Sequence, residues 1–229
     1  NHYNIDNFFF GHGVYPKTFS YWEELFSLIR KENIDISADL EIWRLPFPKK
    51  MVQSFYNTFN YKKSSLSLSP RTISLSVQKK IAKLSDPTFI FKKSEIFNLI
   101  DHINQFQIPL RIWLTIGFPF QNRREIIKDI IFALECVLKY GKSKKSPIAI
   151  MSEPYFIFPG SPVFQDPEKY GIKLKLTKFP EIVNAFKNSK ISFFYNLTNY
   201  DNEFFSGNFI RKLNMLFFLI VAPMFLTSG

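Results

Sequence analysis

Five short segments that contain glycine, proline or polar residues come at or directly after the ends of apolar, strand-like runs. They are Gly11-His12-Gly13, Trp43-Arg44, Ser69-Pro70-Arg71-Thr72, Gly117-Phe118-Pro119-Phe120-Gln121 and Pro159-Gly160-Ser161. In a (β/α) barrel, the residues that bind and react lie at the carboxyl ends of the strands. The pattern therefore nominates these segments as one candidate site.

The residue types in these segments suit ligand binding. His12 could donate or accept a hydrogen bond, and a structural role is the alternative for a single histidine. Arg71 could pair with a carboxylate through its planar guanidinium, and an exposed rim position is the alternative. Gly117 would let the main chain approach a ligand closely. None of these residues is identified as a general acid or base.

The elements that must position these segments alternate along the chain. Strands are expected at residues 5–10, 36–43, 64–69, 110–116 and 148–158, with Gly11-His12-Gly13 ending the first. Helical spacing of apolar residues follows each of the first four, with two helices expected between residues 71 and 107. Residues 110–140 form the central unit, a strand, a glycine turn and a helix. This alternation predicts an α/β fold, a parallel sheet closed or half-closed into a partial (β/α) barrel.

Composition narrows the classes of protein. The chain has 229 residues, of which 46% are hydrophobic, so one domain with a substantial core is expected and intrinsic disorder is not. The net charge of +11 would suit a nucleic acid or a membrane surface, but the basic residues are spread out and no nucleic-acid-binding motif is found. Cys136 is the only cysteine, so an intrachain disulfide is excluded and a buried thiol is expected. These features, with no signal peptide at Asn1, predict a cytoplasmic protein.

Two sequence motifs resemble those of radical S-adenosylmethionine enzymes. Gly117-Phe118-Pro119-Phe120-Gln121 is similar to the turn after the fifth strand of that barrel, and Pro159-Gly160-Ser161-Pro162 is similar to the motif after the sixth. The longer match, from Glu153-Pro154 to Tyr170-Gly171, most resembles the subgroup that also binds cobalamin. The resemblance covers roughly residues 5–171 and implies that about five strands of a six-stranded barrel are present.

The resemblance also implies roles for residues at the strand ends. Gly11, His12 and Gly13 occupy the place of a motif that holds the methionyl amino group, but the usual acid is missing. Ser69 and Arg71 would lie near the ribose, with Arg71 where the cobalamin-binding relatives often have Glu. The turn from Gly117 through Phe118 and Pro119 to Gln121 would pack near adenine. A substrate would meet the rim at Arg44 and at Pro159, Gly160 and Ser161.

One family feature has no counterpart in this sequence. Radical enzymes hold a [4Fe–4S] cluster with three cysteines after the first strand, usually as C-x3-C-x2-C. The alignment would put that strand and loop before Asn1, so the sequence is interpreted as a fragment with no metal ligands of its own. The full-length protein would then cleave S-adenosylmethionine reductively, and cobalamin is a further possible cofactor. The alternative is a degenerate, non-catalytic barrel that acts as a binding module.

The last part of the chain is expected to differ from the barrel. Residues 1–171 are assigned to the barrel and residues 172–229 to a mixed or helical extension, with one helix near residues 179–188. The apolar run at residues 215–226 contains Pro223 and is shorter than the ~20 residues of a membrane span. A buried or truncated helix is therefore predicted there. The substrate and the oligomeric state do not follow from the sequence.

Overall fold

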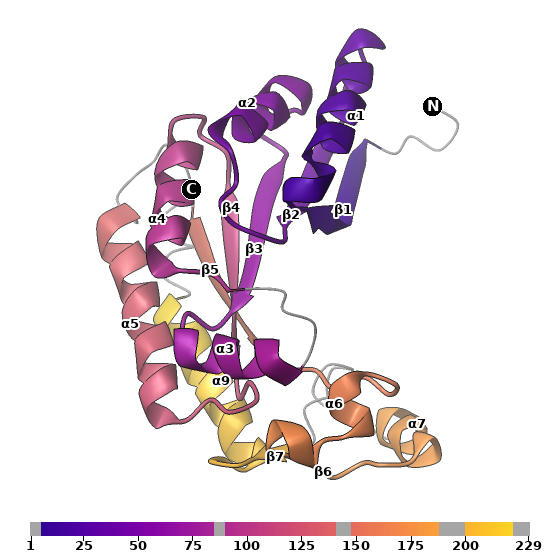
Figure 1. Cartoon of the computed structure of the whole chain (residues 1–229), viewed down its shortest axis with the longest axis vertical. Coiled ribbons are helices and arrows are strands. Elements are labelled where there is room, and N and C mark those ends of the chain that lie inside the picture. The colour runs from indigo at the N-terminus through magenta and orange to yellow at the C-terminus, as the bar shows by residue number, and fades with distance from the viewer. Residues whose placement is uncertain (1–5, 85–89, 141–147, 188–199, 222–229) are drawn as a thin grey trace.

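Five parallel strands form one sheet in which neighbours in space are also neighbours in sequence (Figure 1). The computed structural model describes residues 6–84, 90–140, 148–187 and 200–221. The strands are β1 (Asn7–Val14), β2 (Ser37–Ile42), β3 (Ser65–Arg71), β4 (Leu110–Ile116) and β5 (Ile148–Pro154). All four pairings are parallel. The predicted α/β class, parallel direction and strand order are confirmed.

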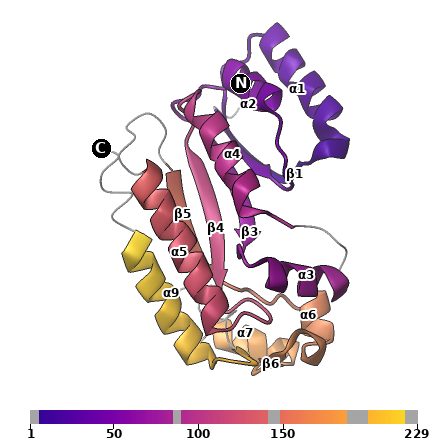
Figure 2. The same ribbon diagram turned by 60° about the vertical axis from the view of Figure 1, so that its left-hand side comes forward.

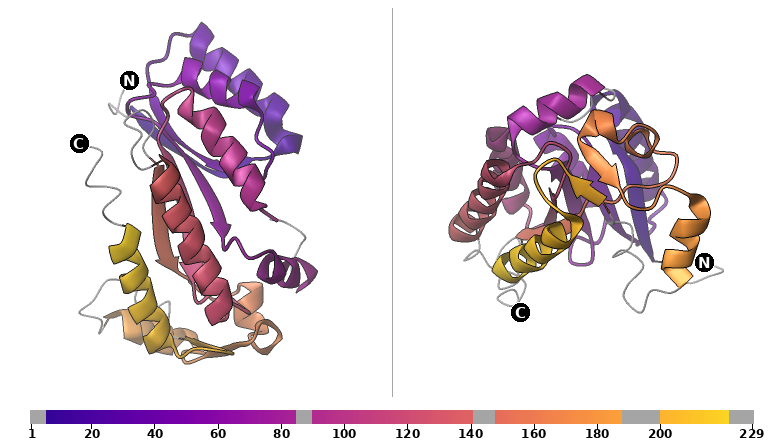
Figure 3. Two further views of the ribbon diagram at one scale, coloured as in Figure 1. Left: turned by 90° about the vertical axis from the view of Figure 1, so that its left-hand side faces the viewer. Right: turned by 90° about the horizontal axis from the view of Figure 1, so that it is seen from below.

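Helices connect these strands and pack on one side of the sheet (Figures 2 and 3). They are the short η1 (Pro16–Thr18), then α1 (Phe19–Lys31), α2 (Lys49–Thr58), α3 (Leu75–Leu84), α4 (Lys93–Asn104) and α5 (Arg123–Tyr140). The two helices expected between β3 and β4 are α3 and α4. The buried Cys136 expected on the helix after β4 is confirmed, since it is fully buried on α5.

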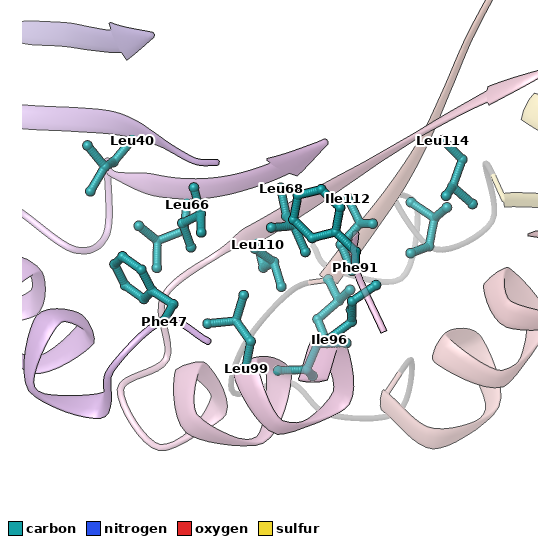
Figure 4. Packing of buried hydrophobic residues seen from close by; sticks show 14 of the residues in the cluster. Leu40, Phe47, Leu66, Leu68, Phe91, Ile96, Leu99, Leu110, Ile112 and Leu114 are labelled. Atoms are coloured by element: carbon teal, nitrogen blue, oxygen red, sulfur yellow. The ribbon is translucent and has the colours of Figure 1, made fainter. Parts of the chain in front are cut away.

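The alternation of side chains along the strands determines where the core lies. In β2, β3, β4 and the first half of β5, the even-numbered residues, such as Leu40, Leu66 and Ile112, are buried against the helices, where Phe91 and Ile96 pack on them (Figure 4). The odd-numbered residues point to the other face, because successive side chains of a strand alternate. Many of them are polar: Asp39, Glu41, Ser65, Ser67, Ser69, Arg71, Arg111 and Glu153. The sheet therefore has one apolar, helix-covered face and one polar face.

The segment after β5 returns to the sheet. It contains α6 (Pro162–Gln165), η2 (Glu168–Tyr170), β6 (Ile172–Leu174), α7 (Phe179–Lys187), β7 (Tyr200–Asn202) and α9 (Gly207–Val221). The strands β6 and β7 pair antiparallel as a separate small sheet. The helix α9 packs against β5 and lies beside α5. It includes residues 215–221 of the apolar run, and residues 222–226 of that run lie outside the described part.

Several expected boundaries were wrong. β1 continues through Gly11-His12-Gly13 to Val14, with an irregular register between Phe10 and Val14, instead of ending at the glycines. β3 extends past Pro70 to Arg71, and β5 ends at Pro154 rather than at residue 158.

Among the described strands the sheet is open, with β1 and β5 at its two edges, so a closed barrel is not observed. Within the described ranges, every helix is too short or too polar to cross a membrane.

Candidate functional site

A hollow of about 190 Å³ lies on the polar face of the sheet. Its lining comes from all five strands and consists of Phe9, Glu41, Ser67, Ser69, Arg71, Arg111, Trp113 and Glu153. We call this set the polar-face site. It combines two guanidiniums, two carboxylates, two hydroxyls and two aromatic rings, which suits a small ligand that carries both charge signs.

Arg71 and Glu153 join β3 to β5 across β4 through an ion pair. The Arg71 side chain is 44% exposed and that of Glu153 is 21% exposed, so the pair remains open to solvent. Desolvation lowers the pKa of Arg71 and the charge of Glu41 opposes that shift. The guanidinium nevertheless stays charged, because its ordinary pKa is above 12. It has five N–H donors, so a ligand carboxylate could share it with Glu153.

Glu41 and Arg111 each form further polar contacts on the same face of the sheet. Ser69 Oγ donates to Glu41 Oε1 at 3.1 Å, and Trp43 Nε1 donates to Glu41 Oε2 at 3.0 Å. Closer to the amino ends of the strands, Arg111 forms an ion pair with Asp39 and donates to Ser65 from Nε at 3.2 Å. The charges of Arg111 and Asp39 are therefore paired with one another. The charged groups nearest the carboxyl ends of the strands are those of Glu41, Arg71 and Glu153.

Tyr155 follows β5 beside this site. Its ring meets Phe118 edge to face, with centroids 5.0 Å apart. Burial raises the pKa of Tyr155 to about 12, although the charge of Arg71 opposes the shift. The phenol therefore stays protonated at neutral pH and can donate a hydrogen bond, but it does not act as a base there.

A second polar network is buried between the turns that follow β3 and β4. Asp129 of α5 is fully buried and accepts hydrogen bonds from Thr72 Oγ1 at 3.0 Å and from the Ile73 amide at 2.7 Å. Its other oxygen accepts from Gln121 Nε2 at 2.7 Å. Gln121 Oε1 in turn accepts from the amides of Gly117 and Phe118 at 2.8 and 3.2 Å. We call this set the buried turn network, and it fixes both turns relative to α5.

Burial raises the pKa of Asp129 to about 7, although the donors from Ile73, Thr72 and Gln121 each favour the carboxylate. Glu125, one turn earlier, contacts Ser74 and lies 2.9 Å from the ammonium of Lys128. Desolvation opposes ionisation of Glu125, but these partners prevail and lower its pKa. Glu125 and Asp129 are therefore held in different states by their surroundings, and Asp129 is the one that titrates near neutrality.

The structure divides the residues that the resemblance assigned to S-adenosylmethionine. Ser69 and Arg71 lie in the polar-face site. Gln121 is completely buried, and its amide is used by the buried turn network. Pro119 is also buried, while Phe118 is half-buried against Tyr155. The side chains of Ser69 and Arg71 therefore line a hollow that a ligand could occupy, whereas the amide of Gln121 is already used within the protein.

Gly117 has a positive φ of 85°, a conformation that favours glycine. A Cβ there would lie 2.5 Å from Cγ2 of Ile210 on α9. The carbonyl of Gly117 accepts a hydrogen bond from the hydroxyl of Tyr200 at 3.1 Å. Glycine is required at this position, but the space next to it is filled by Ile210 rather than left open for an adenine.

The glycines of β1 have a packing role. Trp22 Nε1 of α1 donates to the Gly13 carbonyl at 3.3 Å, and a Cβ at Gly13 would lie 3.3 Å from the Trp22 ring. At Gly11 a Cβ would meet the ring of Phe9. His12 lies between them on β1, and its side chain is outside the described part.

The remaining predicted residues lie at the rim. The guanidinium of Arg44 lies over the ring of Tyr15, 5.7 Å from its centroid. Pro159 and Gly160 are exposed, and Ser161 begins α6 by accepting a hydrogen bond from the Phe164 amide. These residues are near the carboxyl end of the sheet, but none of them lines the polar-face site.

The described residues do not fit an iron–sulfur cluster. Over the described ranges, no group of three His, Cys, Asp or Glu side chains is arranged to hold a metal ion. Burial raises the pKa of the Cys136 thiol to about 12, and it is enclosed in the core. Thiolates are the usual protein ligands of iron–sulfur clusters, so this thiol is unsuited to that role.

Sequence reasoning missed most of the polar-face site. It did not nominate Phe9, Glu41, Ser67, Arg111, Trp113 or Glu153, although each occupies a strand position facing away from the core. The available signal was the alternation of residues 37–42 and 65–71, where every second residue is polar although both faces of a parallel sheet are usually covered. Asp129 was missed because α5 carries several charged residues, and no local pattern marks this one as buried.

No protein-family model matches this chain, and no curated protein matches its sequence.

Proposed function

We propose that the polar-face site binds S-adenosylmethionine, and that this chain forms most of the catalytic barrel of a radical S-adenosylmethionine enzyme. The observation that carries the proposal is the set of charged side chains converging on the polar face of the sheet, Arg71 and Glu153 with Glu41 beside them. The sequential order of the parallel strands supports it, because a barrel is built by continuing such a sheet until its edges meet.

The ligand's charges suit those of the site. S-adenosylmethionine carries a carboxylate, an ammonium, a sulfonium and ribose hydroxyls. Arg71 would hold the carboxylate, and Glu41 and Glu153 would attract the cationic groups and accept from hydroxyls. Trp113 and Phe9, which also line the site, would cover apolar parts of the ligand. In this pose the ligand lies on the polar face, and the filled space beside Gly117 is not used.

The cluster has to be supplied from outside the described residues, and in the resemblance its cysteines precede Asn1. When bound, such a cluster supplies the electron for reductive cleavage. This chain's residues would bind and orient S-adenosylmethionine. Cobalamin would need a site of its own, and no residue of this chain is assigned to it.

Calorimetric titration of the 229-residue chain with S-adenosylmethionine tests the binding. Arg71→Ala should weaken it by about tenfold or more, the usual scale for losing a charge-assisted hydrogen bond. Arg30→Ala, a change to an exposed arginine on α1, should leave it unchanged. No measurable binding, or equal losses in both variants, would refute the proposed site.

A second experiment separates the enzyme from the binding module. The coding DNA upstream of Asn1 should encode C-x3-C-x2-C, and its longer product should form 5′-deoxyadenosine with reductant under anaerobic conditions. A start codon without such a triplet, together with measurable binding of S-adenosylmethionine, would favour the non-catalytic module. The observation behind that alternative is the absence of suitable thiolates among the described residues.

A further inference from the structure

The outward face of α5 carries aliphatic side chains where a surface helix ordinarily carries polar ones. Ile127, Ile131, Leu134 and Leu138 are 54%, 48%, 41% and 80% exposed. Their spacing of four, three and four residues places them in one continuous stripe along the helix. Because the core of this chain does not use these side chains, their position requires another explanation.

None of the acids of α5, which is described throughout, leaves a free exposed carboxylate on this stripe. Glu125 and Asp129 are buried, and Glu135 is half-buried and paired with Lys93 of α4. At the other extreme, Arg123 and Arg124 are exposed in the first turn. Cations are unfavourable at that end of a helix because of its dipole, so they do not serve helix stability. The exposed face of α5 is therefore aliphatic, with cations at its beginning.

The neighbouring helix α9 also exposes apolar and basic side chains. It lies beside α5 in two views (Figures 2 and 3). Phe209, Met215 and Leu216 of α9 are exposed, as is Lys212. The sequence of α9 contains no Asp or Glu. At the far end of α5, Lys139 is partly neutralised by Asp101 at 3.5 Å, so Arg123, Arg124 and Lys212 are the main source of positive charge. We call this the α5–α9 surface.

We propose that the α5–α9 surface docks on the face of an anionic lipid bilayer, with both helices lying in the plane of the interface. Aliphatic side chains would enter the boundary layer while Arg123, Arg124 and Lys212 contact lipid phosphates and carboxylates. The net charge of +11 would attract the whole chain to such a surface. A bilayer also accepts an apolar stripe without requiring a complementary shape.

Charge disfavours a second copy as the occupant. A symmetric dimer puts the same patch on both sides of its interface. The α5–α9 surface would then face itself, so two surfaces that each carry Arg123, Arg124 and Lys212 would repel one another. An anionic bilayer offers the opposite charge to the same residues. The inference is independent of the polar-face site, which lies on the other side of the sheet.

Vesicle flotation tests the proposal, because aggregated protein sinks while vesicle-bound protein floats. The 229-residue chain should float with phosphatidylcholine–phosphatidylserine vesicles and much less with phosphatidylcholine alone. Leu134→Gln with Leu138→Gln should lower the partition coefficient by about tenfold or more, because two leucines no longer enter the apolar layer. Arg123→Gln with Arg124→Gln should weaken binding to the anionic vesicles and reduce its sensitivity to salt.

The matched control is Leu28→Gln with Ile34→Gln, which changes two aliphatic residues of similar exposure on and after α1. It should float as the unchanged chain does, and circular dichroism should show all variants folded. Absence of flotation, equal flotation with neutral vesicles, or equal losses in the control would overturn the proposal. Sedimentation velocity showing a dimer that only the α5 changes dissociate would instead make this surface an interface between copies.

Discussion

Two polar networks lie near the carboxyl ends of the same strands and differ in their access to water. In the buried turn network, Asp129 accepts from Thr72, Ile73 and Gln121, and each group is enclosed. In the polar-face site, Arg71 and Glu153 form an ion pair that remains partly exposed. Losing a partner is costly in the first network, since the remaining groups cannot turn to water. In the second, water can replace a lost partner, so that network can be used for binding at little cost in stability.

Gly117→Ala should have the largest effect on stability, because Gly117 lies in the turn that the buried turn network holds in place. The substitution combines a positive φ with a Cβ placed 2.5 Å from Ile210. We expect the free energy of unfolding to fall by about 2–4 kcal/mol from the sum of backbone strain and overpacking. Urea denaturation followed by circular dichroism measures it.

Gly160→Ala is the control for that prediction. Gly160 has the same φ of 85°, but nothing lies within 4 Å of the Cβ position. Only the conformational strain remains, so the loss should be about 1–2 kcal/mol. Equal losses at the two glycines would mean that Ile210 does not restrict the turn.

Asp129→Asn should have an intermediate effect. The asparagine oxygen could still accept from Thr72 and Ile73, but its NH₂ would face the NH₂ of Gln121. At about pH 5 we expect a loss of about 1–2 kcal/mol, the cost of one unsatisfied buried group. Glu135→Gln, which removes a half-buried carboxylate from the same helix, serves as the control.

The pH dependence sharpens this prediction. Burial raises the pKa of Asp129 to about 7 in the folded state, from an ordinary value of about 3.9. Between these values the folded state holds a proton that the unfolded state has lost, so stability from this group falls as pH rises. The advantage of the wild type over Asp129→Asn should therefore shrink between about pH 4 and pH 7. An advantage that grows over this range would show that Asp129 is ionised throughout.

Glu153→Gln should have the smallest effect on folding. The ion pair with Arg71 is partly exposed, so the free energy of unfolding should change by less than about 1 kcal/mol. Under the proposed function, the same change should alter the affinity for S-adenosylmethionine measurably. A loss of stability as large as that of Asp129→Asn would remove the distinction between the two networks.

The elements could be predicted from the sequence because their signals are local. Apolar residues at helical spacing and short apolar runs located α1 to α5, α7 and all five strands, and the alternation of the two types predicted a parallel sheet. Strand ends were less accurate: β1 continues through its glycines, since Gly13 packs closely against Trp22 instead of forming a turn. Even so, the positions of Ser69, Arg71 and Gly117 near the carboxyl ends of the parallel strands followed from strand direction alone.

The partners of the polar side chains were decided by tertiary structure. Arg111 meets Asp39, a residue 72 positions earlier, because β2, β3 and β4 lie side by side and put both side chains on one face of the sheet. Asp129 meets Thr72 because α5 packs beside the turn after β3. The space beside Gly117 is filled because α9 returns to the sheet from almost 100 residues later. Along the strands, sequence periodicity determined which side chains share a face, since that depends on neighbouring residues. On α5 it did not, because Ile127, Ile131, Leu134 and Leu138 are exposed while Asp129 is buried. Which distant groups meet on that face depends on packing, which no local pattern encodes.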